Sequence, residues 1–167
     1  MKSQKGFTLV ELLVVIAIVA LIGVFAAVAV NAARSKQRDA TRLSNVRMVQ
    51  SALEDHFNEY NTYPDGDLLP LGDASQSACL GASGFAAECL TRDGVFLRTV
   101  LATHEDGLEG IVVCGEPGRN AFCYTQLNNG EDYVIHFELE NSLDPVGLQE
   151  GVNCAIPEGM EAGVCAE

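Results

Sequence analysis

The stretch FTLVELLVVIAIVALIGVFAAVAV, residues 7–30, is apolar at every position except Thr8, Glu11 and Gly23. At about 1.5 Å per residue, a helix of this length reaches about 36 Å, which is enough to cross a bilayer with some tilt. A secretory signal peptide has a shorter apolar core, followed by a small-residue cleavage site. We therefore expect a membrane-spanning helix, preceded by a short basic leader that ends at Gly6.

Glu11 is the unusual residue of this run. A carboxylate inside a membrane segment is costly unless it is neutralised or paired, so it marks function by default. Two alternatives are a wet position close to the interface and a tolerated exception in a long apolar run. Neither explains why the carboxylate follows a basic leader ending in glycine and precedes an uninterrupted apolar stretch.

The heptapeptide KGFTLVE, residues 5–11, resembles the processing site of type IV prepilins and of the pseudopilins of type II secretion. The resemblance implies that prepilin peptidase, a membrane aspartyl peptidase, cleaves between Gly6 and Phe7 and N-methylates the new Phe7 amine. It also implies that Glu11 pairs with the Phe7 amine of a neighbouring subunit as the helix enters a filament. A misplaced carboxylate would stay unpaired, and this penalty fits a role in setting register.

The resemblance further implies a structural subunit of a type IV pilus-like filament, a homopolymer that serves adhesion, motility or DNA uptake. Its partners would be other pilin or pseudopilin subunits, an inner-membrane platform protein, an assembly ATPase and, before assembly, membrane lipid. A type II secretion pseudopilin is one alternative. A membrane-anchored extracytoplasmic binding domain is an alternative of another class.

The expected location follows from the same resemblance. The chain would begin as a single-pass protein of the inner (cytoplasmic) membrane with its C-terminal domain outside, and would end in a cell-surface pilus or a periplasmic pseudopilus. The basic residues favour the opposite orientation, because loops rich in Lys and Arg tend to stay cytoplasmic. Five follow the apolar run, at Arg34, Lys36, Arg38, Arg42 and Arg47. The prepilin-like leader and the cysteines favour the outside location.

Charge is distributed unevenly along the chain. The net charge is −13, and residues 48–167 hold three basic and 21 acidic residues, a balance of 3 − 21 = −18. A surface this acidic repels the phosphate backbone, so we expect no direct binding of nucleic acid.

The cysteines all lie beyond the apolar run. Their number is even, and no pair has the close spacing typical of a zinc site, so disulfides in an oxidising compartment are favoured. Sequence separations of ten, nine and eleven residues suggest three local bridges as a hypothesis: Cys79–Cys89, Cys114–Cys123 and Cys154–Cys165.

Helical periodicity continues beyond the membrane segment. No proline precedes Pro64, so the helix can run unbroken to about Tyr60. Apolar side chains recur there at spacings of three and four, at Leu43, Val46, Val49, Leu53, Phe57 and Tyr60. Arg42 and Arg47 fall on other faces. This pattern predicts a half-buried helix whose apolar stripe covers a small sheet.

The second half of the chain favours strands. Residues 111–114 form a short apolar run, while 122–127 and 133–140 alternate around the turn sequence Asn128-Asn129-Gly130. We expect an antiparallel meander with one face on the helix. Residues 95–103 suggest a short helix, and the tail from Asn141 shows no strong periodicity.

These elements predict an α+β fold, in which a long N-terminal helix packs on a small antiparallel sheet, the architecture that the pilin resemblance also implies. The expected organisation is a leader at residues 1–6, a transmembrane or filament-core helix at 7–30, an amphipathic helix at 31–63 and a disulfide-rich globular domain at 64–167.

Sequence motifs of enzymes are missing. The nucleophile elbow, the P-loop, the dinucleotide fingerprint and H-E-x-x-H do not occur, and His56, His104 and His136 belong to no motif. We therefore predict that the chain is not an enzyme and has no cofactor.

Calcium is the one metal that the sequence raises. Asp65-Gly66-Asp67 with Asp73 lacks the full spacing of a calcium loop and favours a solvated acidic turn. Some pseudopilins bind calcium in a C-terminal loop, which makes Asp144 and Glu150 weak calcium candidates.

Overall fold

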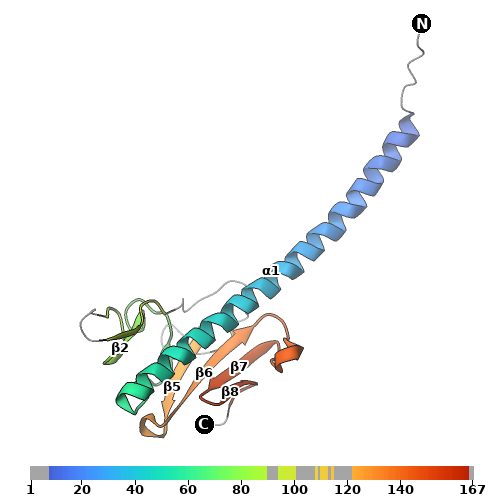
Figure 1. Cartoon of the computed structure of the whole chain (residues 1–167). Helices are drawn as coiled ribbons and strands as arrows, with labels where there is room; N and C mark the ends of the chain where they lie inside the picture. The colour runs from blue at the N-terminus through green and yellow to red at the C-terminus, as the bar shows by residue number, and fades with distance from the viewer. Residues whose placement is uncertain are drawn as a thin grey trace. The chain divides into compact units, whose positions relative to one another are not determined.

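The computed structural model describes residues 8–89, 94–100, 108, 110–112, 114 and 122–165. The chain divides into two compact units, Met1–Gln37 and Arg38–Glu167. The described residues form one long helix, α1 (Leu9–Tyr60), and two antiparallel sheets (Figure 1). The predicted α+β class and the helix–sheet arrangement are confirmed.

Helix α1 is continuous over 52 residues, as the lack of proline before Pro64 predicted. Every residue from Thr8 to Arg34 is exposed, whereas burial begins in the second unit. The helix ends where Asn61 adopts a φ of +55°, a left-handed conformation that asparagine tolerates. The Asn61 N–H donates to the Phe57 carbonyl at 2.7 Å and so closes the last turn.

The larger sheet has the strand order β1-β5-β6-β7-β8 and is antiparallel throughout. Its strands are β1 (Leu69–Pro70), β5 (Phe122–Leu127), β6 (Asp132–Leu139), β7 (Gly151–Ile156) and β8 (Gly159–Ala162). The short helix η1 (Asn128–Gly130) joins β5 to β6, and all three of its residues have positive φ. The predicted strands at 122–127 and 133–140 and the turn between them are therefore confirmed.

The main core lies between α1 and the larger sheet (Figure 1). Val46, Val49 and Leu53 of the helix stripe are buried there, together with alternate side chains of β6, namely Tyr133, Ile135 and Phe137. The predicted stripe is thus the buried face of the helix. Its last member, Tyr60, remains 40% exposed.

The other face of the larger sheet is also covered. Val112 and Cys114 form a second buried cluster with Cys123 of β5, against which Val152 of β7 packs. The Ile111 N–H donates to Oε2 of the buried Glu138 on β6 at 2.9 Å. A strand at residues 111–114 was therefore a wrong prediction, because the described residues of this segment cover the sheet without pairing into it.

A small second sheet has the strand order β3-β2-β4, from β2 (Cys79–Gly81), β3 (Gly84–Ala86) and β4 (Val95–Leu97). The expected helix at residues 95–103 was wrong at positions 95–100. There the β-branched and aromatic residues of β4 pair with β2 instead. Positions 101–103 lie outside the described residues. The tail, for which no periodicity was predicted, forms the hairpin of β7 and β8.

All six cysteines lie among the described residues and none is free. The structure pairs Cys79 with Cys89, Cys114 with Cys123, and Cys154 with Cys165, the three local bridges that the spacing suggested. The second bridge ties the irregular covering segment to β5, and the third ties the tail to β7. Each bridge thus holds a stretch of irregular chain against a strand.

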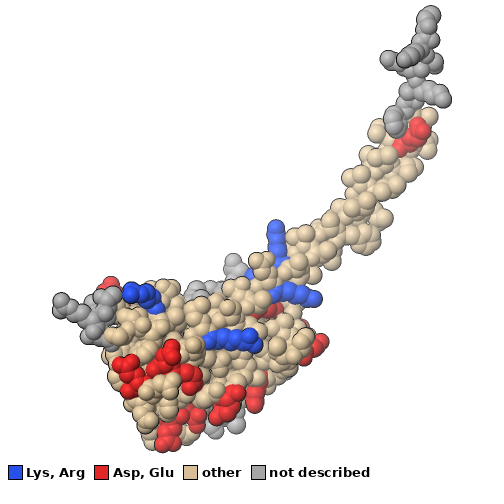
Figure 2. Space-filling view, in the orientation of Figure 1, with Lys and Arg blue, Asp and Glu red and all other residues tan. Residues whose placement is uncertain are grey.

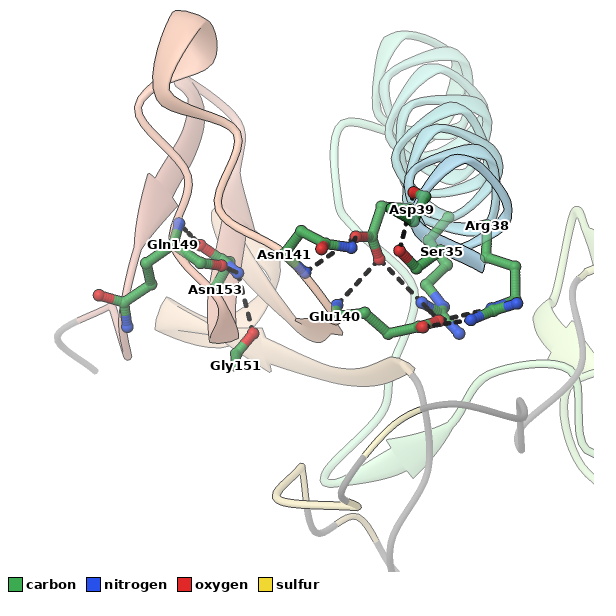
Figure 3. Close-up of polar contacts among 10 residues, drawn as sticks. Ser35, Arg38, Asp39, Glu140, Asn141, Gln149, Gly151 and Asn153 are labelled. Atoms are coloured by element: carbon green, nitrogen blue, oxygen red, sulfur yellow. Dashed lines mark hydrogen bonds and ion pairs between the residues drawn. The ribbon is translucent and has the colours of Figure 1, made fainter. Parts of the chain in front are cut away.

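A buried ion cluster joins the helix to the end of β6 (Figure 3). Asp39 and Arg42 are fully buried, and their side chains lie 2.8 Å apart. Arg42 also donates to Oε1 of Glu140 at 2.6 Å. Arg38 forms a bidentate ion pair with the same carboxylate. Arg42 lies outside the apolar stripe, as the pattern indicated, yet it is fully buried, because acidic partners satisfy its guanidinium.

Backbone groups complete this cluster. Oδ1 of Asp39 accepts the Glu140 N–H at 2.9 Å, and Oδ2 accepts the backbone and side-chain N–H groups of Asn141 at 2.9 and 2.8 Å. Both carboxylate oxygens are thus used, as a buried charge requires. Hydrogen bonds from Arg38, and secondarily from Arg42, hold the pKa of Glu140 below its ordinary value.

Candidate functional site

The residues singled out for processing sit at the start of the chain. Gly6 and Phe7 lie outside the described residues, so their predicted roles stay predictions. Glu11 falls in the first turn of α1. Asp39, the next acidic residue along the helix, lies 28 positions further on, which leaves Glu11 as the one charge of the apolar run.

Thr8 and Glu11 hold each other in a capping box at the beginning of α1. The Thr8 N–H donates to Oε2 of Glu11 at 2.8 Å, and the Thr8 hydroxyl donates to the same oxygen at 2.7 Å. In return, Oγ1 of Thr8 lies 3.3 Å from the Glu11 N–H, which donates to it. The arrangement satisfies N–H groups that a helix start otherwise leaves without partners.

This contact gives Glu11 a role inside its own helix, which the sequence interpretation overlooked. The signal was present, because threonine followed three positions later by glutamate, just before an apolar run, is the capping-box pattern. Both Thr8 bonds go to Oε2, and Oε1 makes no hydrogen bond to any residue that the structure describes. The carboxylate therefore keeps acceptor capacity for a further donor.

The part of α1 that lies in the first unit presents a continuous apolar surface. Its large apolar side chains are all between 47% and 79% exposed; they are Leu9, Val10, Leu12–Ile16, Ile18, Val19, Leu21, Ile22, Val24, Phe25, Val28 and Val30. By length and composition α1 qualifies as a membrane-crossing helix, the only such helix among the described residues. An apolar surface of this size is not stable in water and requires a lipid or protein cover.

The calcium candidates remain scattered. Asp144 begins the short helix η2 (Asp144–Val146), and Glu150 precedes β7; both are exposed. Asp65 and Asp67 are exposed in their turn, while hydrogen bonds from Ser75 lower the pKa of Asp73. Within the described part of the chain, no three potential metal ligands converge.

The histidines differ in their surroundings. His56 is buried at the end of α1, and His136 is half-buried on β6. His104 lies outside the described residues. None of the hydrogen bonds recorded for them forms a nucleophile–base pair.

Comparison with known protein families identifies the N-terminal segment. Residues 1–27 match the prokaryotic N-terminal methylation motif. The chain carries the type IV pilin and pseudopilin leader. The matched segment ends inside α1, and it therefore includes the Thr8–Glu11 capping box and most of the exposed apolar surface. No curated protein and no solved structure gave a match.

The pilin-type leader and the exposed helix together fit a membrane-anchored subunit of the pilin or pseudopilin type, processed by prepilin peptidase and assembled by pilin machinery. Such a subunit is structural rather than enzymatic. The leader is shared by pilins and pseudopilins, so the match leaves the two systems undistinguished.

Proposed function

We propose that the chain is the structural subunit of a type IV pilus-like filament. One observation carries the proposal, namely that the methylation motif matched at residues 1–27 includes the start of α1, whose large apolar side chains from Leu9 to Val30 are all exposed. In the membrane, lipid covers this surface before assembly. In the filament, the same helices of neighbouring copies cover one another, as the small side chains of Gly23, Ala26 and Ala27 would permit.

Processing creates an amine that can donate a hydrogen bond to Glu11. Cleavage between Gly6 and Phe7 would leave a methylated, positively charged amine one residue before the Thr8 cap. Within one copy, Thr8 occupies Oε2 of Glu11. The amine of a neighbouring copy would then bind Oε1, and only the correct axial position of the helix would bring the two charges together.

The globular domain would form the outside of the filament. Its residues from 48 onward carry the large acidic excess, and Figure 2 shows acidic side chains gathered over the face drawn. Contacts between different surfaces of successive copies do not close, so they extend into a fibre. A cytoplasmic ATPase and an inner-membrane platform protein would supply the work of extracting the apolar helix from lipid.

The test is intact mass and N-terminal sequencing of the protein from membranes and from sheared cell-surface material. A chain that begins with N-methyl-Phe7, lighter by two hydrogens for each disulfide and present in the sheared fraction, is the expected result. The same mature chain confined to membranes would favour the pseudopilin alternative. A chain that still begins at Met1 would mean a permanent anchor, and the filament proposal would fail.

Replacement of Glu11 by alanine tests the charge pairing separately. We expect the Glu11→Ala variant to be cleaved normally but to enter sheared filaments poorly. Thr8→Val is the matched control, because it removes the hydroxyl from the capping box while leaving the carboxylate for the neighbouring amine. Assembly of Glu11→Ala at the wild-type level would show that the pairing with Phe7 is wrong.

A further inference from the structure

A cleft of about 340 Å³ lies at the C-terminal end of α1, within the second unit. It is lined by His56 and Tyr60 of the helix, by residues 62–65 of the following segment and by residues 82–84 between β2 and β3. The membrane helix and the leader contribute nothing to it. The cleft is therefore a feature of the globular domain that the proposed function does not yet use.

The surroundings of this cleft are negative. The carbonyl end of a helix carries a partial negative charge, and the last turn of α1 has no basic residue to offset it. Asp55 and Glu59 are exposed on the same last turns and add charge of the unfavourable sign. Asp65, which lines the cleft, is exposed and makes no hydrogen bond or ion pair with any described residue. A cation is the ligand that these groups favour.

His56 supplies a buried acceptor. The residue is 3% exposed, and its Nδ1 lies 2.9 Å from the carbonyl oxygen of Thr62. Because a carbonyl only accepts, Nδ1 carries the hydrogen, and Nε2 of the neutral ring is a lone-pair acceptor. Nε2 has no hydrogen-bond partner among the described residues. A buried acceptor without a donor is costly, and an incoming N–H group would relieve that cost.

Aromatic rings complete the lining. Tyr60 is 40% exposed, and its ring centroid lies 4.8 Å from that of His56. Tyr63 also lines the cleft and stacks on Phe57 with the centroids 4.6 Å apart. Faces of aromatic rings attract ammonium and guanidinium groups, most strongly beside a carboxylate and away from water. The cleft thus has an aromatic lining and a free carboxylate, both of which favour a basic side chain, and one of its lining residues, His56, carries a buried nitrogen without a partner among the described residues.

We propose that this cleft receives a basic side chain from α1 of a second copy of the chain. Among the described residues of α1, Arg38 and Arg42 are already paired with Glu140. Arg34, Lys36 and Arg47 are exposed, and the structure records no partner for them. Donor and cleft thus occupy different parts of α1, which makes the contact heterologous and able to propagate along a filament. The inference rests on the proposed filament function and names one of its interfaces.

Charge reversal in the full-length chain, expressed in cells that assemble the filament, is the direct experiment. We expect Asp65→Lys to lower the yield of sheared filaments about tenfold, because like charges placed together at an interface are strongly unfavourable. Asp67→Lys is the matched control, since Asp67 is exposed two positions away and does not line the cleft. It should stay within about twofold of wild type. Combining Asp65→Lys with Arg34→Glu, Lys36→Glu or Arg47→Glu in turn should restore assembly for the residue that enters the cleft.

A photo-crosslinking amino acid at Ser83 reports the partner directly, because Ser83 is exposed at the rim of the cleft. Mass spectrometry of crosslinked filaments should find residues 34–47 of another copy. Crosslinks to a different protein, or normal assembly of Asp65→Lys in cells whose wild-type chain forms filaments, would overturn this contact alone. A processed wild-type chain that never enters filaments would overturn the proposed function and this contact together.

Discussion

The two units of the chain are stabilised in opposite ways. Residues 9–37 form a helical segment whose large apolar side chains are all exposed, so its stability depends on what surrounds it. Residues 38–167 hold a sheet covered on both faces, a buried ion cluster and three disulfides. In the proposed assembly, the first unit passes from lipid into the filament, whereas the second stays folded throughout.

The contrast extends to one carboxylate in each unit. Asp39 uses both oxygens within its own domain, where it accepts four hydrogen bonds from Arg42, Glu140 and Asn141. Glu11 uses one oxygen, which Thr8 binds. A fully satisfied buried carboxylate contributes to a fixed packing arrangement. A half-satisfied carboxylate in an apolar helix is suited to a partner that arrives later.

The largest expected effect is on leader cleavage in the first unit, with the second unit unchanged. Gly6→Val should abolish cleavage, because the bulky branched side chain replaces the small residue at the expected cleavage site, and the protein should keep residues 1–6 in its intact mass. Gly23→Val is the control: apart from the adjacent backbone of α1, a side chain there meets no atom of the described residues within 4 Å, so processing should be normal. Denaturation of the domain should be unchanged in both. Removal of residues 1–6 from Gly6→Val would contradict the assigned site.

The next largest effect is on the stability of the second unit, with the first unit unchanged. Arg42→Met keeps the length of the side chain but leaves the carboxylates of Asp39 and Glu140 without their shared cation. We expect the free energy of unfolding to fall by about 3–5 kcal/mol, measured by urea denaturation of the full chain in detergent with near-ultraviolet circular dichroism of the buried tyrosines.

Arg47→Met is the matched control for this arginine. Arg47 is exposed on the same helix with no recorded partner, so its loss should change stability by less than about 0.5 kcal/mol. Leader cleavage should proceed in both variants, since Gly6 belongs to the other unit. Equal stability of the two variants would show that the ion cluster does not hold the helix to the sheet.

A smaller effect is expected from the bridge that ties down the tail. Cys154→Ala with Cys165→Ala opens a loop closed by a sequence separation of 11 residues, and the unfolding free energy should fall by about 3 kcal/mol. Reduction of the wild-type protein under conditions that open only this bridge is the comparison. Unfolding curves that coincide before and after its removal would mean that β7 and β8 hold the tail unaided.

Local signals account for the elements that the sequence predicted correctly. The stripe of Val46, Val49 and Leu53 and the alternation of Tyr133, Ile135 and Phe137 are each complete within one segment, so the pattern is readable without knowledge of its partner. The turn at Asn128-Asn129-Gly130 is equally local, because asparagine and glycine tolerate the positive φ that it requires.

Polar partners that a hydrophobic pattern does not include account for the buried polar residues that were missed. Asn153 interrupts the apolar pattern of β7, yet it is fully buried, because it exchanges hydrogen bonds with Gln149 and its side-chain amide also donates to the Gly151 carbonyl (Figure 3). Arg42 likewise has the polarity of a surface residue, and its burial depends on Glu140, 98 positions away. A one-dimensional pattern assigns such polar residues to solvent, since it cannot include the partner that makes their burial favourable.

The smallest expected effect is a pH dependence that arises in the ion cluster. Hydrogen bonds from the two arginines hold the pKa of Glu140 below its ordinary value of 4.5. A carboxyl whose pKa is lower in the folded chain stabilises the fold above the ordinary value and loses that contribution as pH falls through the folded value.

At pH 7, Glu140→Gln should therefore reduce the unfolding free energy by about 1 kcal/mol. The two proteins should converge as pH falls from 4.5 through the folded value, because the wild-type carboxyl becomes protonated over that range. Glu150→Gln, at an exposed position, should follow wild type at every pH. A gap between wild type and Glu140→Gln that stayed constant down to pH 3 would show that packing, and not the charge on Glu140, carries its contribution to the domain.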